Sequence, residues 1–85
     1  MQNVEIYTKD FCPYCSRAKA LLAQKGVEFT EYNLLKQPNL KTQMVERANG
    51  GTTVPQIFIG DRHIGGCDDL FALEFASDLD GLLNA

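Results

Sequence analysis

The stretch VEIYTKDFCPYCSRAKALLAQ, residues 4–24, contains the pattern on which the fold of this chain depends. Val4 to Tyr7 alternates between apolar and polar side chains, which predicts a β-strand. A helix is expected from Pro13 onwards, because proline is favoured at the first helical position. The apolar side chains of this helix recur on one face, at Cys15, Ala18, Leu21 and Leu22. The Cys12–Cys15 pair therefore lies where a strand ends and a helix begins.

The rest of the chain continues this alternation of strands and helices, with glycine and proline between them. The expected elements are a strand over 27–32, a helix opened by Pro38 and stopped by Asn49–Gly51, strands over 56–59 and 62–64, and helices over 67–76 and 79–83. The two leading crossovers imply a parallel pair, and the hairpin adds antiparallel strands. The expected class is α/β in the order β-α-β-α-β-β-α, a four-stranded mixed sheet with helices on both faces.

Length and composition exclude several classes of protein. With 85 residues and 45 % hydrophobic side chains, the chain suits a single folded domain over residues 1–85 rather than a disordered segment. A net charge of −3 argues against binding to nucleic acid or to an anionic membrane surface. No apolar run exceeds four residues, so no membrane-spanning helix is expected. Residues 1–10 lack the basic and apolar regions of a secretory signal, so we expect a cytoplasmic protein.

The two cysteines of the pair are expected to differ in reactivity. Cys12 lies at a helix N-terminus, where unpaired N–H groups and the helix dipole stabilise a thiolate, and Lys9 adds a nearby positive charge. Cys15 falls on the apolar face of the helix and should be buried and less reactive. The two-residue spacer lets the sulfurs form a readily reduced disulfide within one turn. The pair therefore predicts redox chemistry, with Cys12 as the attacking thiol and Cys15 as the resolving thiol.

Two other interpretations of the cysteines stay open on the sequence. Three cysteines are too few for a secreted disulfide scaffold, but Cys12 and Cys15 could be ordinary core residues. Cys12, Cys15, His63 and Cys67 also have the residue types of a structural zinc site, C-x2-C followed by H-x3-C. The chain has enough apolar residues to build a core without metal, and His63 falls in a short strand. We therefore expect no metal site.

Three separated motifs make the chain resemble the glutaredoxins. They are Thr8-Lys9 before Cys12-Pro13-Tyr14-Cys15, then Thr53-Val54-Pro55, and finally Gly65-Gly66-Cys67-Asp68-Asp69-Leu70. The similarity covers nearly the whole chain, and within the family it points to the bacterial glutaredoxin 3 type. It implies a thioredoxin fold, in agreement with the order of elements deduced above.

The resemblance implies a glutathione site beside the cysteines. In the family, the residue matching Cys12 becomes glutathionylated. The matching Pro55 is cis, and the backbone of Val54 would pair with glutathione as an added strand. Asp68 would accept from the γ-glutamyl amine, and Lys9 would face the glycine carboxylate. The glutathione-binding residues implied in this way are Lys9, Tyr14, Thr53, Val54, Pro55, Gly66, Cys67 and Asp68.

The function implied by the resemblance is that of a glutathione-dependent thiol–disulfide oxidoreductase, an enzyme of electron transport and cell redox homeostasis. Its substrates would be protein disulfides and protein–glutathione mixed disulfides, with ribonucleotide reductase as a candidate. Glutathione would be a co-substrate, and we expect no tightly bound cofactor and a monomer. Two rivals are a redoxin supplied by thioredoxin reductase, and an iron–sulfur carrier with a [2Fe–2S] cluster held by Cys12 and glutathione.

Overall fold

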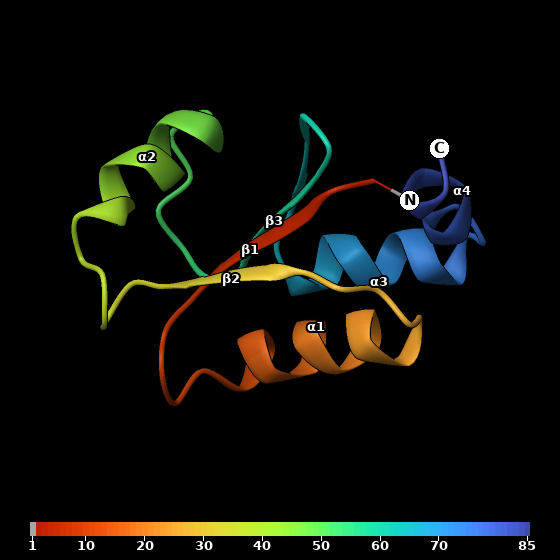
Figure 1. Ribbon diagram of the computed structural model, residues 1–85, viewed down its shortest axis with the longest axis horizontal. Helices are drawn as coiled ribbons and strands as arrows, with labels where there is room; N and C mark the ends of the chain where they lie inside the picture. The colour runs from red at the N-terminus through yellow and green to blue at the C-terminus, as the bar shows by residue number, and fades with distance from the viewer. Residues whose placement is uncertain (1) are drawn as a thin grey trace.

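A four-stranded sheet with helices on both faces makes up the protein, as the computed structural model of residues 2–85 shows (Figure 1). The elements are β1 (Val4–Thr8), α1 (Pro13–Gln24), β2 (Thr30–Asn33), α2 (Leu40–Arg47), β3 (Gln56–Ile59), β4 (Arg62–Gly65), α3 (Cys67–Phe75) and α4 (Leu79–Leu83). The strand order across the sheet is β2-β1-β3-β4. The predicted mixed sheet and order of elements are thereby confirmed.

The two helical connections, through α1 and through α2, lead to strands that run in opposite directions relative to β1. The first, through α1, makes β2 parallel to β1 as expected. The second, through α2, returns the chain so that β3 runs antiparallel to β1. The β3–β4 hairpin is also antiparallel. Antiparallel pairing is thus not confined to the hairpin, because β3 enters the sheet beside β1 from the opposite end.

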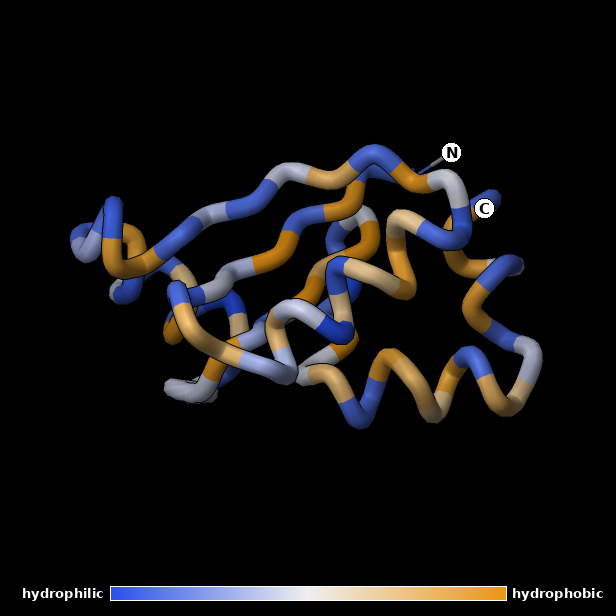
Figure 2. The backbone as a smooth tube through the Cα atoms, turned by 90° about the horizontal axis from the view of Figure 1, so that it is seen from below, coloured by the Kyte–Doolittle hydropathy of each residue, from blue (hydrophilic) through white to orange (hydrophobic). Residues whose placement is uncertain are grey.

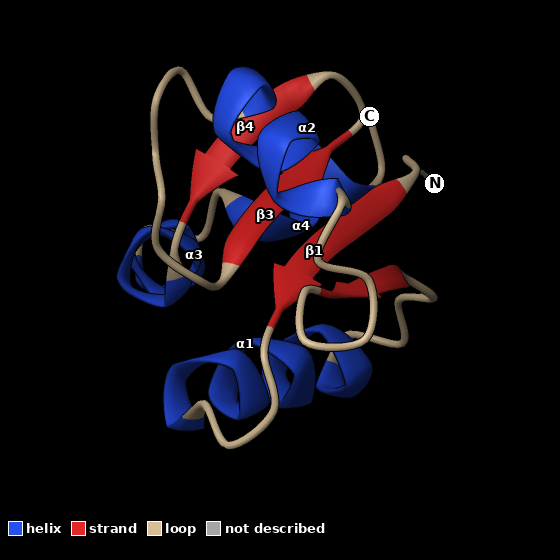
Figure 3. Cartoon of the chain, turned by 90° about the vertical axis from the view of Figure 1, so that its left-hand side faces the viewer, coloured by secondary structure: helices blue, strands red, loops and turns tan. Residues whose placement is uncertain are grey.

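Alternation along β1 divides the core into two layers, one on each face of the sheet. Val4 and Ile6 pack with α1, α3 and α4, whereas Tyr7 packs with Met44 of α2. Figure 3 shows α1 and α3 on one side of the sheet and α2 on the other. Figure 2 shows the same amphipathic alternation along the chain, since apolar and hydrophilic segments follow one another within single helices.

Two predicted boundaries are wrong. The strand expected over 27–32 lies over Thr30–Asn33, because the hydrogen-bonding partner of β2 is β1, whose register with it begins at Glu5 and Thr30. The alternation before residue 30 reflects burial, since Val27 is in the core. The helix expected from Pro38 begins at Leu40, because its first turn is closed by short-range bonds such as Lys41 N–H to Pro38 O at 3.2 Å.

The two ends of the chain lie side by side, at the far end of the sheet from the α1 N-terminus (Figure 1). The Gln2 N–H donates to the Leu83 carbonyl at 2.8 Å, and α4 buries Leu79 and Leu83 in the core. The predicted short helix over 79–83 is confirmed. Every helix within residues 2–85 falls short of the length and apolarity needed to cross a bilayer.

Candidate active site

Cys12 is the N-cap of α1, so its sulfur lies at the open end of the helix. Its backbone is extended, with φ −108° and ψ 106°, and Pro13 occupies the start of the helix as predicted. The Cys12 Sγ accepts the backbone N–H of Cys15 at 3.3 Å. The first N–H groups of a helix lack intrahelical partners and carry the positive end of the dipole, so the Cys12 sulfur lies beside hydrogen-bond donors.

Cys15 has a different environment, although it lies on the same turn. Its side chain is only 1 % exposed, whereas Cys12 is half-buried. Burial, and then a hydrogen bond with the Cys12 side chain, raise the pKa of the Cys15 thiol to about 12. Cys12 and Cys15 are both free thiols in this structure. Cys15 therefore remains protonated at neutral pH and is shielded from solvent.

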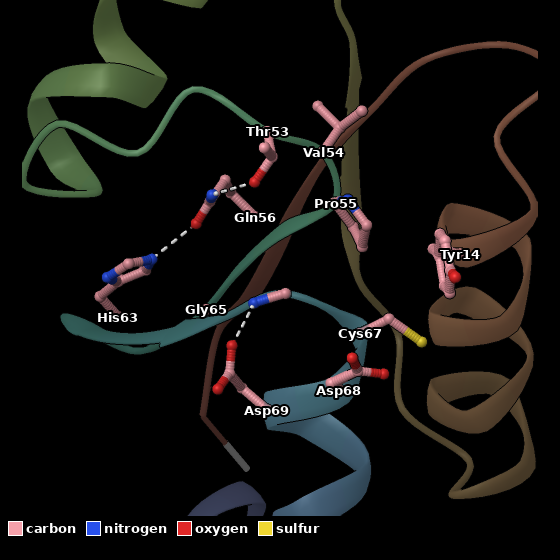
Figure 4. Close-up of a pocket in the computed structure, with 11 residues that line it drawn as sticks. Tyr14, Thr53, Val54, Pro55, Gln56, His63, Gly65, Cys67, Asp68 and Asp69 are labelled. Carbon is pink, nitrogen blue, oxygen red and sulfur yellow. Dashed lines mark hydrogen bonds between the residues drawn. The ribbon is translucent and has the colours of Figure 1, made fainter.

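A groove of about 350 Å³ is lined by Val54, whose carbonyl oxygen is near the Cys12 sulfur. Figure 4 shows the segment from Thr53 to Gln56 on one side, the start of α3 on another, and Tyr14 of α1 on a third. The lining residues are Tyr14, Thr53, Val54, Pro55, Gln56, His63, Gly65, Gly66, Cys67, Asp68 and Asp69. The Cys12 Sγ lies 4.0 Å from the carbonyl oxygen of Val54, which places the sulfur at that edge of the groove.

The segment before β3 presents backbone rather than side-chain groups to the groove. The Val54–Pro55 peptide bond is cis, as the resemblance implies. Within residues 2–85, the Val54 N–H and C=O have no backbone hydrogen-bond partner. An extended peptide could therefore pair with this residue in the manner of an added strand.

The start of α3 separates the roles of two neighbouring carboxylates. Asp69 Oδ2 accepts the backbone N–H of Gly66 at 2.9 Å and so caps the helix. Asp68 makes no such bond, is exposed, and lines the groove. Cys67 is buried beside it, and burial raises the pKa of its thiol. Asp68 is thus the carboxylate of this pair that remains available to a ligand.

The structure brings together most of the residues expected to bind glutathione, with one exception. Seven of the eight line the groove, but Lys9 does not; it is exposed in the loop after β1. Sequence reasoning missed Gln56, whose side chain is 5 % exposed and joins His63 Nε2 at 2.7 Å and Thr53 Oγ1 at 3.4 Å. A polar residue within an otherwise apolar buried strand was the signal that could have found it.

The zinc alternative has no support in the described residues. Within residues 2–85, no three His, Cys, Asp or Glu side chains converge in a group that could hold a metal ion. His63 is instead hydrogen-bonded to Gln56 and stacked on Phe58, with ring centroids 5.0 Å apart. Cys12, Cys15, His63 and Cys67 therefore do not form the four-ligand cluster that their spacing in the sequence suggests.

Comparison with known proteins adds independent findings. The family model described as glutaredoxin matches residues 4–64. The chain is 58 % identical over 83 residues to glutaredoxin 3 of Escherichia coli K12, covering 98 % of this chain and 99 % of that protein. The solution structure of glutaredoxin from Brucella melitensis matches at a TM-score of 0.81 and 57 % identity, over 98 % of this chain and 89 % of that one.

A more distant neighbour is the crystal structure of a buckwheat glutaredoxin–glutathione complex. It matches at a TM-score of 0.88 and 30 % identity, over 98 % of this chain and 77 % of that one. These solved structures have the thioredoxin fold, which confirms the fold implied by the sequence.

Proposed function

Because this chain belongs to the glutaredoxin family of thiol–disulfide oxidoreductases, we propose that it reduces protein–glutathione mixed disulfides and protein disulfides at the expense of glutathione. The observation that supports this most directly is the position of the Cys12 sulfur. It accepts an N–H at the open end of α1 and lies 4.0 Å from the carbonyl oxygen of Val54, a residue that lines the groove. A sulfur that is not fully buried and lies beside a ligand-sized groove suits attack on a bound disulfide.

The proposed reaction with a mixed disulfide consists of two exchanges. The Cys12 thiolate attacks the glutathione sulfur, a bond forms between these two sulfurs, and the substrate protein leaves as a thiolate. The thiolate of a second glutathione then attacks the same glutathione sulfur. Oxidised glutathione leaves, and Cys12 is a thiolate again. Overall, one disulfide is exchanged for another: the substrate cysteine is released as a thiol, and the second glutathione is oxidised as it joins the glutathione taken from the substrate.

Reduction of a protein disulfide requires Cys15 as well. Cys12 attacks one substrate sulfur and forms a mixed disulfide with the protein, while the substrate S–S bond breaks and its other sulfur leaves as a thiolate. Cys15 then attacks Cys12, its proton passes to the departing substrate thiolate, and a Cys12–Cys15 disulfide remains. Two glutathione molecules reduce this disulfide. The pKa of Cys15, about 12, supports this order of events, because a buried thiol does not compete with Cys12 for the first attack.

The groove offers groups that complement glutathione at several points. We infer that the Val54 backbone pairs with the glutathione cysteine residue, while Asp68 accepts from the γ-glutamyl amine. The N–H groups at the start of α3, a helix of nine residues, would hold the γ-glutamyl carboxylate. The volume of about 350 Å³ is in the range of small-ligand sites. Lys9, outside the groove, would reach the glycine carboxylate only by extending along the surface.

A coupled assay tests the proposal. The mixed disulfide of glutathione and 2-mercaptoethanol is reduced with glutathione, glutathione reductase and NADPH by the wild type, Cys12→Ser and Cys15→Ser. We expect no activity in Cys12→Ser, and retained activity in Cys15→Ser, which should fail only on a protein disulfide. Replacement of glutathione and its reductase by thioredoxin reductase should abolish turnover. Activity in Cys12→Ser, or equal turnover with thioredoxin reductase, would contradict the proposal.

A further inference from the structure

A row of aromatic side chains and one arginine begins at the groove and follows the seam between α1 and α3. The rings at its two ends are exposed, whereas Phe71 in its middle is half-buried against the core. The row consists of Tyr14 and Arg17 on α1 and of Phe71 and Phe75 on α3, and we call it the aromatic stripe. Tyr14 is 55 % exposed and Phe75 is 81 % exposed, although burial would stabilise both rings. The redox chemistry of the cysteines does not use Arg17, Phe71 or Phe75.

Helical spacing and short ring distances place these side chains in one row. Tyr14 and Arg17 are three residues apart and share a face of α1. The Arg17 guanidinium carbon lies 5.6 Å from the Phe71 ring centroid, and the Phe71 and Phe75 centroids are 6.1 Å apart. At the other end of the row, Tyr14 lines the groove together with Asp68. Figure 1 shows α1 and α3 running side by side, so the row leads away from the cysteines along both helices.

The charge of the stripe indicates which partner it fits. Arg17 makes no ion pair with any carboxylate of residues 2–85. A guanidinium over an aromatic ring, flanked by exposed rings, has the composition that is enriched at the energetic centres of protein interfaces. The complementary surface would therefore carry a carboxylate for Arg17 and an apolar side chain for Phe75.

We propose that the aromatic stripe binds the polypeptide of the substrate protein on one side of its reactive cysteine. This inference rests on the proposed function. When Cys12 attacks a mixed disulfide, the groove holds the glutathione part, so the polypeptide part must leave the groove across an edge. Tyr14 forms such an edge, and the stripe continues from it. The proposal gives the protein a preference for disulfides in acidic, apolar sequence surroundings.

The length of the stripe sets the spacing of the recognised residues. From Cys67 to Phe75, α3 covers about 12 Å at 1.5 Å per residue. An extended peptide spans this distance in about four residues. Because Cys67 lines the groove, this count starts where the peptide leaves it: a carboxylate about two residues and an apolar side chain about four residues beyond that point would meet Arg17 and Phe75.

The test compares two short peptides, each with one glutathionylated cysteine. One peptide carries Glu at the position expected to meet Arg17 and Leu at the position expected to meet Phe75. The other peptide carries Lys and Ser at these two positions. Phe75→Ala and Arg17→Glu should each raise KM for the Glu–Leu peptide about fivefold, equivalent to ~1 kcal/mol. Neither variant should change kcat/KM for the mixed disulfide of glutathione and 2-mercaptoethanol. The matched control is Leu35→Ala, since Leu35 is an equally apolar side chain, 54 % exposed, between β2 and α2.

The possible outcomes separate the two proposals. Equal KM values for the two peptides with the wild type, or equal losses on peptide and small disulfide in Phe75→Ala, would overturn the role of the stripe while leaving the proposed function standing. Sedimentation of the wild type tests a second copy as the occupant, and a dimer that Phe75→Glu dissociates would also overturn it. Inactivity of the wild type on the small mixed disulfide would refute the proposed function itself.

Discussion

At the scale of single residues, Cys12 and Cys15 are three residues apart but have different environments. Cys12 precedes the first turn of α1, and its sulfur lies 4.0 Å from the Val54 carbonyl oxygen, whereas Cys15 lies within that turn and is only 1 % exposed. The same helix therefore leaves one sulfur half-buried beside an N–H donor and removes the other from solvent. The burial difference expected from the apolar face of the helix is confirmed.

The raised pKa of Cys15 predicts how its alkylation depends on pH. In Cys12→Ser, burial, the larger cause of the shift, remains, so Cys15 should react with iodoacetamide only in strongly alkaline solution. With a pKa of about 12, roughly one thousandth of the thiol is ionised at pH 9. Mass spectrometry over a pH series measures the rates. Cys15→Ser, which keeps Cys12, is the control, and equal rates in the two variants at neutral pH would contradict the prediction.

At the scale of elements, the junction between β4 and α3 contains two glycines with different surroundings. Gly65 has a φ of +114°, and a Cβ there would collide with the Asp69 carboxylate that caps the helix. Gly66 has an ordinary extended backbone, and a Cβ there would lie 3.5 Å from the Pro55 carbonyl oxygen, a normal contact. The first glycine is therefore required by the fold, and the second leaves space at the groove.

Alanine substitutions at this junction should consequently have different effects. Gly65→Ala should lower the free energy of unfolding by about 2 kcal/mol, because a strained backbone and a displaced cap both cost stability. Gly66→Ala should leave stability nearly unchanged but raise KM for glutathione about fivefold, or ~1 kcal/mol, because its methyl group occupies part of the groove. Urea unfolding and coupled kinetics measure the two effects. A large stability loss in Gly66→Ala, with unchanged KM, would show that this assignment is reversed.

At the scale of the whole molecule, the active-site end and the chain ends are separate. The N-terminus of α1, which Cys12 caps, lies at one end of the sheet, whereas α4 and the two termini lie at the other (Figure 1). α4 closes the core with Leu79 and Leu83, and Gln2 bonds to its last turn. A chain of 85 residues has little apolar area to spare, so this short helix should matter for stability more than for chemistry.

Leu83→Ala tests this separation. Leu83 is 2 % exposed, and truncation of a leucine in such a position costs about 3 kcal/mol of unfolding free energy. We expect that loss in a denaturant titration, with kcat/KM of the folded enzyme unchanged on a small mixed disulfide. Leu35→Ala, at an exposed leucine, should change stability by less than about 0.5 kcal/mol. A drop in kcat/KM of folded Leu83→Ala would indicate that the two ends are coupled.

Local sequence signals were sufficient for much of this protein. The start of α1 at Pro13, its end before Gly26, the β3–β4 hairpin and the exposure difference between the two cysteines all follow from periodicity and from the conformational preferences of proline and glycine. These features depend on residues within a few positions of one another. The motifs of the whole chain also indicated the family and hence the fold.

Tertiary structure alone decided the features that join distant segments. The first residue of β2 depends on the register of β2 with β1. The antiparallel direction of β3 beside β1 depends on how the segment that contains α2 connects β2 to β3. The groove exists because residues 53–56 lie against the start of α3, and the same packing brings Gln56 to His63 and leaves Lys9 outside. Hydrophobic periodicity specifies which side of an element is buried, but not which element covers it. The hydrophobic effect favours the removal of apolar area from water and does not select the segment that covers that area.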